Sequence, residues 1–599
     1  AGIIGGAGNH TFDIGADNSV EATRVADKER ITDLEVTQYL SAGGNAVRIG
    51  MAPGAKLDFV SLVEVTEGAT SDDALRVVFK GHEMAEYWTR LVNTTMYFHM
   101  DMMTEKSTGF IDASLPNGIF PLLYWVADAG PAMLEMARWG YTEAAKQATL
   151  FRTAQNHYSG DNGAAGLVFA TIAYLMKGDN YTGDYVTKAW PVLKDGLDYY
   201  VDEIQNSPYH LIKGTGLETT NNGYGIYNNT IAYFALLAGA EAAEKTGHTA
   251  EQASWLAAAD LLAQGITDHL IADRDISWLG RTIKQGTWRY SLDGNKSDGS
   301  DAPWINAGWF GVGSAEELYY GYKKPQTTRN NAVETWRQIT DKTLDYHSEN
   351  FWADWKLYGH NRGFGTDYGV LSERAGWPLL TMLMSDRMDM ARKNLHHVIW
   401  NSSDLNFDHD NEGVQETSPW VLVREVNATD HGIALPNEIG NGGSNEDMNL
   451  VEYIMALKNV RIMAGLDDTL EGGDNVIIVP RIPYGWTGVK VNRWPSHYRT
   501  GTGDIGQTHI TYDYTILPER ATLKIAADDA IAGTKFRFGP FAKDAVVVAV
   551  TENGSAVDAS RIREELSGDA KWVWVDGEIA TTDITYQVDV QIPDLVFAN

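Results

Sequence analysis

The spacing of hydrophobic residues changes twice along the chain and divides it into three parts. Residues 1–80 contain short alternating runs between glycine-rich turns, and a period of two is typical of β-strands. From about residue 81 apolar residues recur with a period near 3.6, as in amphipathic helices. After residue 466 the alternation returns. The pattern predicts a β N-terminal segment at 1–80, a helical domain at 81–466 and a β domain at 467–599.

About twelve helices are expected in the middle part. In 183–205, one face collects Trp190, Leu193, Leu197, Tyr200, Val201 and Ile204. The other helices are expected near 83–104, 120–139, 142–156, 163–177, 228–246, 250–271, 312–323, 328–348, 370–384, 386–399 and 446–464. Gly140 and Gly247 stand where helices end, and Thr249–Gln252 reads as a capping box.

Twelve helices form six hairpins, and such pairs bury both faces when they close into a double ring. Small residues from Ala235 to Ala243 would let neighbouring helices approach closely. An open solenoid would also bury these faces, but no fixed repeat period is visible. We therefore expect a mainly α protein with β: an (α/α)6 toroid, preceded by the β segment and followed by a β-sandwich, whose strands alternate between turn signals after residue 467.

Composition and charge exclude several classes of protein. The chain has 48 basic and 80 acidic residues, and 48 − 80 gives a net charge of −32, which repels nucleic acid and anionic membranes. No apolar run approaches the roughly 20 residues that a membrane-spanning helix needs. Cysteine is absent, so disulfides, thiolate catalysis and cysteine-ligated metals are excluded.

The sequence favours a secreted or cell-envelope protein. The chain begins at Ala1, as a processed chain or a fragment would. Acceptor triplets for N-glycosylation occur at Asn9, Asn93, Asn180, Asn228, Asn295, Asn401, Asn427 and Asn553. Such triplets also arise by chance. The oligomeric state is left open.

Carboxylates and aromatic rings are the candidate chemistry. No HExxH motif is present and histidines are scattered, whereas cleavage of a glycosidic bond needs only two suitably placed carboxyl groups. Most of the 64 aromatic residues must pack the core. Some on long loops are expected to stack on sugar rings, and these candidates are Trp288, Trp304, Trp309, Trp352 and Trp355.

Three segments resemble motifs of six-hairpin glycosidases, most of all the glucoamylase family (glycoside hydrolase family 15). Leu115–Ala132 resembles the family's motif for the innermost sugar subsite and contains Trp125 and Asp128. Gly214–Glu218 resembles the loop of the catalytic acid, and Leu435–Gly443 the loop of the base. Ala127 departs from the family, which usually has Arg there.

The resemblance implies an exo-acting, inverting hydrolase of an oligo- or polysaccharide. Glu218 would be the general acid and Glu438 the general base, with carboxyl groups roughly 6.5–9.5 Å apart and a bell-shaped pH–rate profile. Trp125 and Asp128 would bind the sugar, and Glu373 is the reserve carboxylate, although Arg374 makes an ion pair its more ordinary role. Glu218, Glu438 and Asp128 could each also be an ordinary solvated acid near a helix start.

No cofactor is required for this chemistry, but a structural Ca²⁺ is a candidate. Asp408, Asp410 and Glu412 resemble the start of a calcium loop, while Pro419 occupies the twelfth position, where an EF-hand has Glu.

Two other functions stay open. A polysaccharide lyase would combine a helical toroid with β domains, but it would need a Tyr or His base and a basic cleft for its anionic substrate. A non-catalytic carbohydrate-binding or cell-surface structural protein would keep the fold without the chemistry, and Ala127 favours this alternative.

Overall fold

The structure is a computed structural model, and it describes part of the chain. The described residues are 2–4, 10–16, 22–26, 31–33, 47–51, 56–59, 75–82, 85, 88–89, 104–105, 110–111, 126–155, 165–213, 223–278, 281–283, 285–288, 291–292, 336–345, 369–371, 379–392, 395, 425–427, 450–467 and 476–593. The chain divides into two compact units, residues 1–75 and 76–599.

The first unit contains two three-stranded antiparallel sheets. One has the order β4-β1-β6 and the other β3-β2-β5. Their strands are β1 (Gly2–Ile4), β2 (His10–Ala16), β3 (Ala22–Ala26), β4 (Ile31–Asp33), β5 (Val47–Met51) and β6 (Lys56–Phe59). The alternating runs in this part of the sequence therefore form strands, as predicted.

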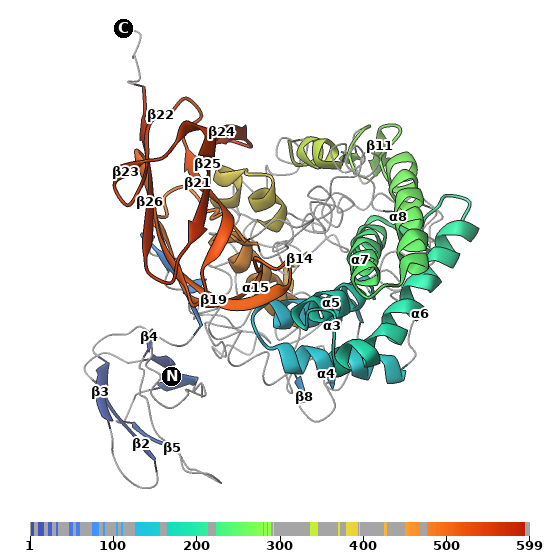
Figure 1. Cartoon of the computed structure of the whole chain (residues 1–599), viewed down its shortest axis with the longest axis horizontal. Helices are drawn as coiled ribbons and strands as arrows, with labels where there is room; N and C mark the ends of the chain where they lie inside the picture. Colours follow the sequence, from blue (N-terminus) through green and yellow to red (C-terminus); the bar gives the residue numbers. More distant parts are fainter. Residues whose placement is uncertain are drawn as a thin grey trace. The chain divides into compact units, whose positions relative to one another are not determined.

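Three helical hairpins are described in the second unit. They are α3 (Val126–Arg138) with α4 (Thr142–Gln155), α5 (Gly166–Gly178) with α6 (Asp184–Asn206), and α7 (Ile226–Lys245) with α8 (Thr249–His269). Their short connections make the two helices of each pair antiparallel neighbours. Figure 1 shows α3, α5 and α7 side by side on an inner arc, with α4, α6 and α8 outside them.

Helices of the same arc run in the same direction. Between the outer helices, Trp190 stacks on His248 with ring centroids 3.8 Å apart, and Lys194 pairs with Glu251 at 3.4 Å. Between the inner helices, Gly166 at the start of α5 lies against Ile231 near the start of α7. This double layer is the arrangement that six-hairpin toroids use, here described for three hairpins.

Burial explains why α6 and α7 differ in sequence. The amphipathic α6 buries Leu193, Leu197 and Tyr200 and exposes its other face, as predicted. Nearly all of α7 is buried, because it packs between α5 and the outer helices. A Cβ on Gly239 of α7 would lie 2.1 Å from Leu197 of α6, so the small residues of α7 do permit a close approach.

Helix ends follow the predicted punctuation, with one exception. Gly140 and Gly247 adopt the left-handed conformation at φ +93° and +80°, as helix-ending glycines do. The predicted capping box is wrong: α8 begins at Thr249 itself, its N-cap is His248, and that residue makes no capping side-chain bond. Stacking of His248 on Trp190 holds the chain at this point instead.

The remaining described helices continue the helical part. They comprise residues 336–345, 379–384 and 388–392, and α15 (Leu450–Ala464). The predicted ranges 328–348, 370–384, 386–399 and 446–464 overlap these helices, but residues 370 and 371 form a β-strand instead. In the range 83–104, residues 85, 88 and 89 are helical and residue 104 is in a strand, whereas 312–323 lies outside the described residues. Short two-stranded sheets accompany them: β8 (Thr104–Glu105) with β9 (Phe110–Ile111), β11 (Ile276–Trp278) with β12 (Arg281–Ile283), and β14 (Gly369–Leu371) with β15 (Glu425–Asn427).

Two sheets form the C-terminal β part. The larger has the order β23-β22-β26-β20-β19-β18-β7 and the smaller β16-β17-β21-β25-β24. The larger contains β7 (Arg76–Lys80), β18 (Gly488–Arg499), β19 (Ile505–Leu517), β20 (Arg520–Ala527), β22 (Val546–Glu552), β23 (Ser555–Ala556) and β26 (Ile584–Gln591). The smaller contains β16 (Leu466–Asp467), β17 (Ile477–Ile478), β21 (Ile531–Phe541), β24 (Ile562–Ser567) and β25 (Ala570–Ile579).

The two sheets pack face to face. Alternate residues of β19 point inward and are buried, including Tyr512 and Tyr514. Phe536 of β21 packs against Tyr586 of β26 with ring centroids 4.6 Å apart, and the Tyr514 hydroxyl donates to the Gly539 carbonyl at 2.7 Å. This is sandwich packing with a common aromatic core, as the sequence predicts.

The first strand of the large sheet comes from far away in the sequence. β7 pairs with β18, Lys80 opposite Gly488 and Arg76 opposite Asn492. The hydrophobic pattern identifies this strand but groups it with residues 1–74, because alternation carries no information about the partner strand. Pairing with β18 therefore ties the start of the helical part to the C-terminal sheets.

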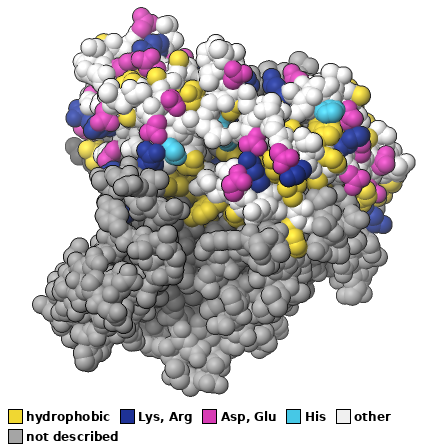
Figure 2. All heavy atoms as spheres, turned by 60° about the horizontal axis from the view of Figure 1, so that its bottom comes forward, with side chains coloured by type: hydrophobic (Ala, Val, Ile, Leu, Met, Phe, Trp, Pro, Cys, Tyr) yellow, Lys and Arg dark blue, Asp and Glu magenta, His cyan; other side chains and the backbone are white. Residues whose placement is uncertain are grey.

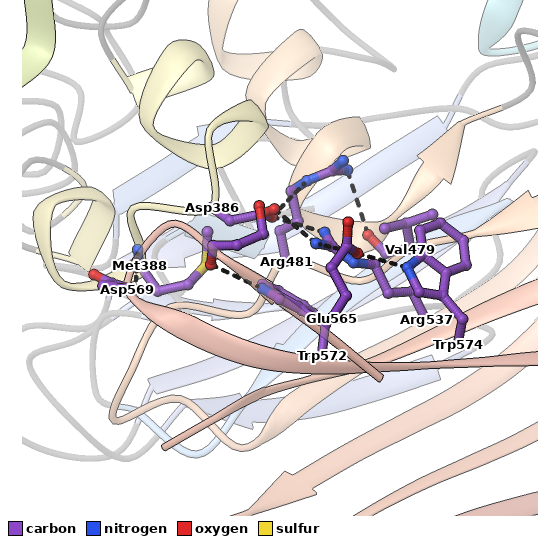
Figure 3. A network of polar contacts seen from close by, with 10 residues as sticks. Asp386, Met388, Val479, Arg481, Arg537, Glu565, Asp569, Trp572 and Trp574 are labelled. Carbon is purple, nitrogen blue, oxygen red and sulfur yellow. Dashed lines mark hydrogen bonds and ion pairs between the residues drawn. The ribbon is translucent and has the colours of Figure 1, made fainter. Parts of the chain in front are cut away.

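A buried ionic cluster joins the helical part to the small sheet (Figure 3). Asp386, in the turn after helix 379–384, accepts two hydrogen bonds from Arg537 of β21 at 2.8 and 2.7 Å. Arg537 also pairs with Glu565 at 3.0 Å and lies over the Trp572 ring. Burial by itself would raise the pKa of Asp386, but the charge and hydrogen bonds of Arg537 outweigh it and lower that pKa.

The same turn receives the tip of the β24–β25 hairpin. Asp569 accepts hydrogen bonds from the backbone N–H groups of Met388 and Asp389 at 3.0 and 2.9 Å and so caps helix 388–392. Gly568, at φ +60°, brings its backbone so close to Asp386 that a Cβ would lie 2.0 Å from the Asp386 carbonyl oxygen. The helical turn and the hairpin tip are thus shaped to each other.

Charges of both signs mix on the described surface. Figure 2 shows acidic and basic side chains next to one another on one face rather than in separate patches. Some of these neighbouring charges form ion pairs, such as Lys524 with Asp583 at 2.6 Å and Arg520 with Asp589 at 2.5 Å. None of the helices in the described part is both long and apolar enough to cross a membrane.

Candidate active site at the N-terminal ends of the inner helices

The large sheet fixes the direction of the helices α3, α5 and α15. At the C-terminal end of α3, Trp139 packs on Trp494 of β18 with ring centroids 4.8 Å apart. Near the end of α5, the Tyr174 ring packs on His497 of the same strand, with ring centroids 5.2 Å apart. At the end of α15, the carbonyl of Ala464 accepts a hydrogen bond from the Tyr512 hydroxyl of β19. All three helices therefore end at the sheet, and their N-terminal ends lie away from it.

A buried ion pair links α3 and α15 near those C-terminal ends. The carboxylate of Glu135 accepts hydrogen bonds from Nε and Nη2 of Arg461 at 3.1 and 3.0 Å. It also accepts from Arg138 at 3.2 Å and from the Trp139 indole at 3.1 Å. A bidentate pair of this kind holds its two helices in one register. It lies at the end of the helices remote from the candidate site and belongs to the packing.

The helix α7 runs parallel to this group. Its sixth residue, Ile231, lies against Gly166 at the start of α5, and Glu241 accepts a hydrogen bond from Tyr181, just beyond the end of α5, at 3.3 Å. Neither α5 nor α7 has a capping side chain or an acidic residue in its first turn. The positive end of the helix dipole at these starts favours carboxylates and hydroxyl oxygens.

Four of the predicted site residues stand in the sequence at the start of α3 or before α3, α7 and α15. Trp125 directly precedes α3, and Asp128 is the third residue of that helix. Glu218 precedes the start of α7 by 226 − 218 = 8 residues, and Glu438 precedes that of α15 by 450 − 438 = 12 residues. Trp125, Glu218, Glu438, Trp304, Trp309, Trp352, Trp355, Glu373, Asp408, Asp410 and Glu412 lie outside the described residues, as does the side chain of Asp128. The distance between the two catalytic carboxyls stays a prediction.

Among the loop tryptophans, Trp288 falls within the described residues. It is only 1% exposed, and its indole N–H donates to Thr340 at 2.9 Å while its backbone N–H donates to Thr343 at 3.0 Å. The ring also contacts Trp336, which in turn donates to Thr267 of α8 at 3.0 Å. This buried position favours a packing role, fastening the loop to helix 336–345, over the predicted contact with a sugar.

We expect Trp288→Phe to lower stability and leave turnover unchanged. The variant loses the indole hydrogen bond to Thr340 and leaves a small cavity, which together cost about 1–3 kcal/mol of unfolding free energy. Denaturant unfolding and steady-state kinetics measure the two effects separately. A raised KM in a variant of normal stability would instead show that the ring contacts the substrate.

The entry to α7 contains three buried polar residues for which the sequence predicts no catalytic or substrate-binding role. Asn228, Asn229 and Thr230 are buried in the first turns of a helix that is otherwise mostly apolar. The Asn229 carboxamide hydrogen-bonds to Ile212 and to Gly225, on either side of the segment that carries Glu218. Two adjacent asparagines at the start of a buried helix were the available signal, but their partners follow only from the fold.

Metal binding is not indicated in the part of the chain that the structure describes. No group of three or more His, Asp or Glu side chains there is arranged to hold an ion. The candidate calcium ligands Asp408, Asp410 and Glu412 lie outside it, so a structural Ca²⁺ stays a prediction.

Comparison with known proteins identifies the fold. No family model matches the chain, and no curated protein matches it either. Among solved structures, the α-L-rhamnosidase from Dictyoglumus thermophilum matches with a TM-score of 0.51 and 11% identity over 98% of this chain and 60% of that one. The chain thus spans about three-fifths of that protein. At this identity the likeness concerns the fold.

Two further solved structures are more distant. The Streptomyces avermitilis α-L-rhamnosidase complexed with L-rhamnose matches with a TM-score of 0.46 and 11% identity, over 98% of this chain and half (50%) of that one. An unsaturated glucuronyl hydrolase specific for heparin matches with a TM-score of 0.39 and 13% identity, over 63% of this chain and 97% of that one.

The chain is therefore structurally similar to six-hairpin glycosidases, with a helical part and C-terminal β-sheets. The narrower resemblance to glucoamylases rests on the sequence motifs alone and stays a prediction.

Proposed function

We propose that the chain is an exo-acting, inverting glycoside hydrolase, with Glu218 as general acid and Glu438 as general base. One observation carries the proposal: α3, α7 and α15 run in parallel, and the segments with Asp128, Glu218 and Glu438 lead into their N-terminal ends. These three acids, far apart in the sequence, thus stand at the start of one of these parallel helices or on the segments before them. The large sheet covers the opposite ends of α3, α5 and α15.

The two roles require different protonation states. The base Glu438 must be ionised before it accepts a proton from water, and a helix start within one turn of a carboxylate favours that state. The acid must be protonated when it meets the leaving oxygen, so Glu218 needs apolar surroundings or a nearby negative charge that raises its pKa. In an inverting enzyme a water molecule fits between the base and the anomeric carbon, and this sets the expected separation of roughly 6.5–9.5 Å.

The anomeric form of the first product tests the proposal directly. The purified chain is mixed with α- and β-linked oligosaccharides, including α-L-rhamnosides and α-glucosides, and proton NMR follows the anomeric signals of the sugars. We expect one sugar product of inverted configuration within the first minutes, before mutarotation, and no such product from Glu438→Gln. A product of retained configuration would indicate a covalent intermediate and carboxyls about 5–5.5 Å apart.

The two other functions predict different results with the same oligosaccharides. An unsaturated product that absorbs in the ultraviolet would identify a polysaccharide lyase. Sugar binding without turnover would identify a non-catalytic carbohydrate-binding or structural protein, the alternative favoured by Ala127 in the first turn of α3.

An extracellular or cell-envelope location stays a prediction from the sequence, which contains several sequons for N-glycosylation. Of these, Asn180 and Asn553 are exposed, whereas Asn228 is buried and closed to glycosylation in the folded chain.

A further inference from the structure

A single side chain bridges the two ends of the segment that carries Glu218. Asn229 lies in the first turn of α7 and is 0% exposed. Its Oδ1 accepts a hydrogen bond from the backbone N–H of Ile212 at 2.7 Å. Its Nδ2 donates to the carbonyl of Ile212 at 3.1 Å and to that of Gly225 at 2.7 Å. Ile212 lies just before residues 213–224 and Gly225 just after them.

The bridge depends on a carboxamide. Ile212 is fully buried, and Asn229 satisfies both its backbone N–H and its C=O. Loss of the side chain would leave these groups without partners in a buried position, which is costly. Only Asn and Gln offer an acceptor and two donors on one uncharged group, and the longer Gln would place them differently.

Other contacts hold the same two chain ends. The N–H of Leu211 donates to the Ser207 hydroxyl at 3.2 Å, which ties the first end to the end of α6. At the second end, β10 (Tyr224–Gly225) pairs with β13 (Ser291–Leu292). The ring of Tyr224 also packs on that of Tyr209, with ring centroids 5.2 Å apart. Asn229 connects these two anchored ends to each other and to α7.

We propose that Asn229 is a positioning residue for Glu218. It fixes Ile212 relative to Gly225, the two described residues between which Glu218 stands in the sequence. The inference rests on the proposed function, since it assigns Asn229 a purpose only if Glu218 is the acid. A general acid must lie within hydrogen-bonding reach of the leaving oxygen, and a displacement of 1 Å can cost about 100-fold in rate.

The chain provides a matched control in the adjacent residue. Asn228 is 1% exposed in the same helical turn, and its side-chain amide has no hydrogen-bond partner in the described structure. Asn228→Ala therefore removes the same atoms from the adjacent helix position without touching the bridge. Asn229→Asp is a second disruptive variant of nearly the same shape, because a carboxylate oxygen would face the carbonyls of Ile212 and Gly225 in place of the donor.

The first experiment tests the bridge without using activity. Hydrogen exchange of the Ile212 amide and limited proteolysis, by trypsin after Lys213 and by a glutamate-specific protease after Glu218, are measured on the full chain. We expect exchange and cleavage at least about tenfold faster in Asn229→Ala and in Asn229→Asp, and as in the wild type in Asn228→Ala. Rates equal to wild type in Asn229→Ala would overturn the bridge.

The second experiment tests the positioning role. In Asn229→Ala we expect kcat to fall about 10- to 100-fold with KM changed less than about threefold, and the alkaline limb of the pH–rate profile, set by the acid, to move while the acidic limb stays. Asn228→Ala keeps the wild-type kcat and profile. Faster exchange with unchanged kcat and profile would overturn the positioning role. A wild-type chain without any turnover would refute the proposed function, and the exchange data would still decide on the bridge.

Discussion

Glu438→Gln is expected to lose turnover on every glycoside that the wild type cleaves, by about 10²–10⁴-fold in kcat. Glutamine has nearly the same shape as glutamate but cannot accept the proton of the attacking water, so the loss lies in the chemical step. The acidic limb of the bell-shaped pH–rate profile, which reports the base, should vanish with it. Steady-state kinetics over a range of pH measures both effects.

Glu218→Gln is expected to depend on the leaving group. Natural oligosaccharides need a proton on the departing oxygen, so their kcat falls by a similar factor, whereas a 4-nitrophenyl glycoside leaves as a stabilised phenolate and is affected much less. Glu438→Gln serves as the control, because it should impair both substrates equally. Equal activity of either variant and the wild type on an oligosaccharide would remove that residue from the mechanism.

The second large effect concerns stability. Asp386→Asn is expected to lower the free energy of unfolding by about 3–5 kcal/mol. An amide NH2 group replaces one of the two oxygens that accept from Arg537, which is 4% exposed and keeps a buried charge compensated only in part by Glu565. Denaturant unfolding measures the loss. Asp528→Ala, which breaks an ion pair of half-exposed groups with Arg493, is the control and should cost less than about 1 kcal/mol.

The stability difference should depend on pH in one direction. The pKa of Asp386 is lowered in the folded chain, so its contribution is complete above the pKa of an unfolded aspartate, about 3.9, and is lost as the pH falls through the lower, folded value. The gap between wild type and Asp386→Asn should therefore begin to close below about pH 4. A gap that is the same at pH 3 and pH 7 would show that the ionised carboxylate contributes nothing.

Local patterns in the sequence determine most of the elements. The period of 3.6 and the glycines at 140 and 247 identify α3 to α8 to within a few residues, because helix formation and termination depend on neighbours within one or two turns. The alternation after residue 467 likewise identifies β18, β19 and β20. The motif order also indicates which acids precede α7 and α15.

Partners across long distances are decided only by the tertiary structure. β7 pairs with β18 across more than 400 residues, and Asp386 meets Arg537 from another part of the chain; neither strand alternation nor residue type specifies such a partner. The parallel direction of α3, α5, α7 and α15 follows from their packing on one another and of α3, α5 and α15 on one sheet. Asn229 is a clear case. Its side chain is polar in a buried helix, which the sequence shows, but its bridging role depends on Ile212 and Gly225 meeting there, and only folding brings the two ends of that segment together.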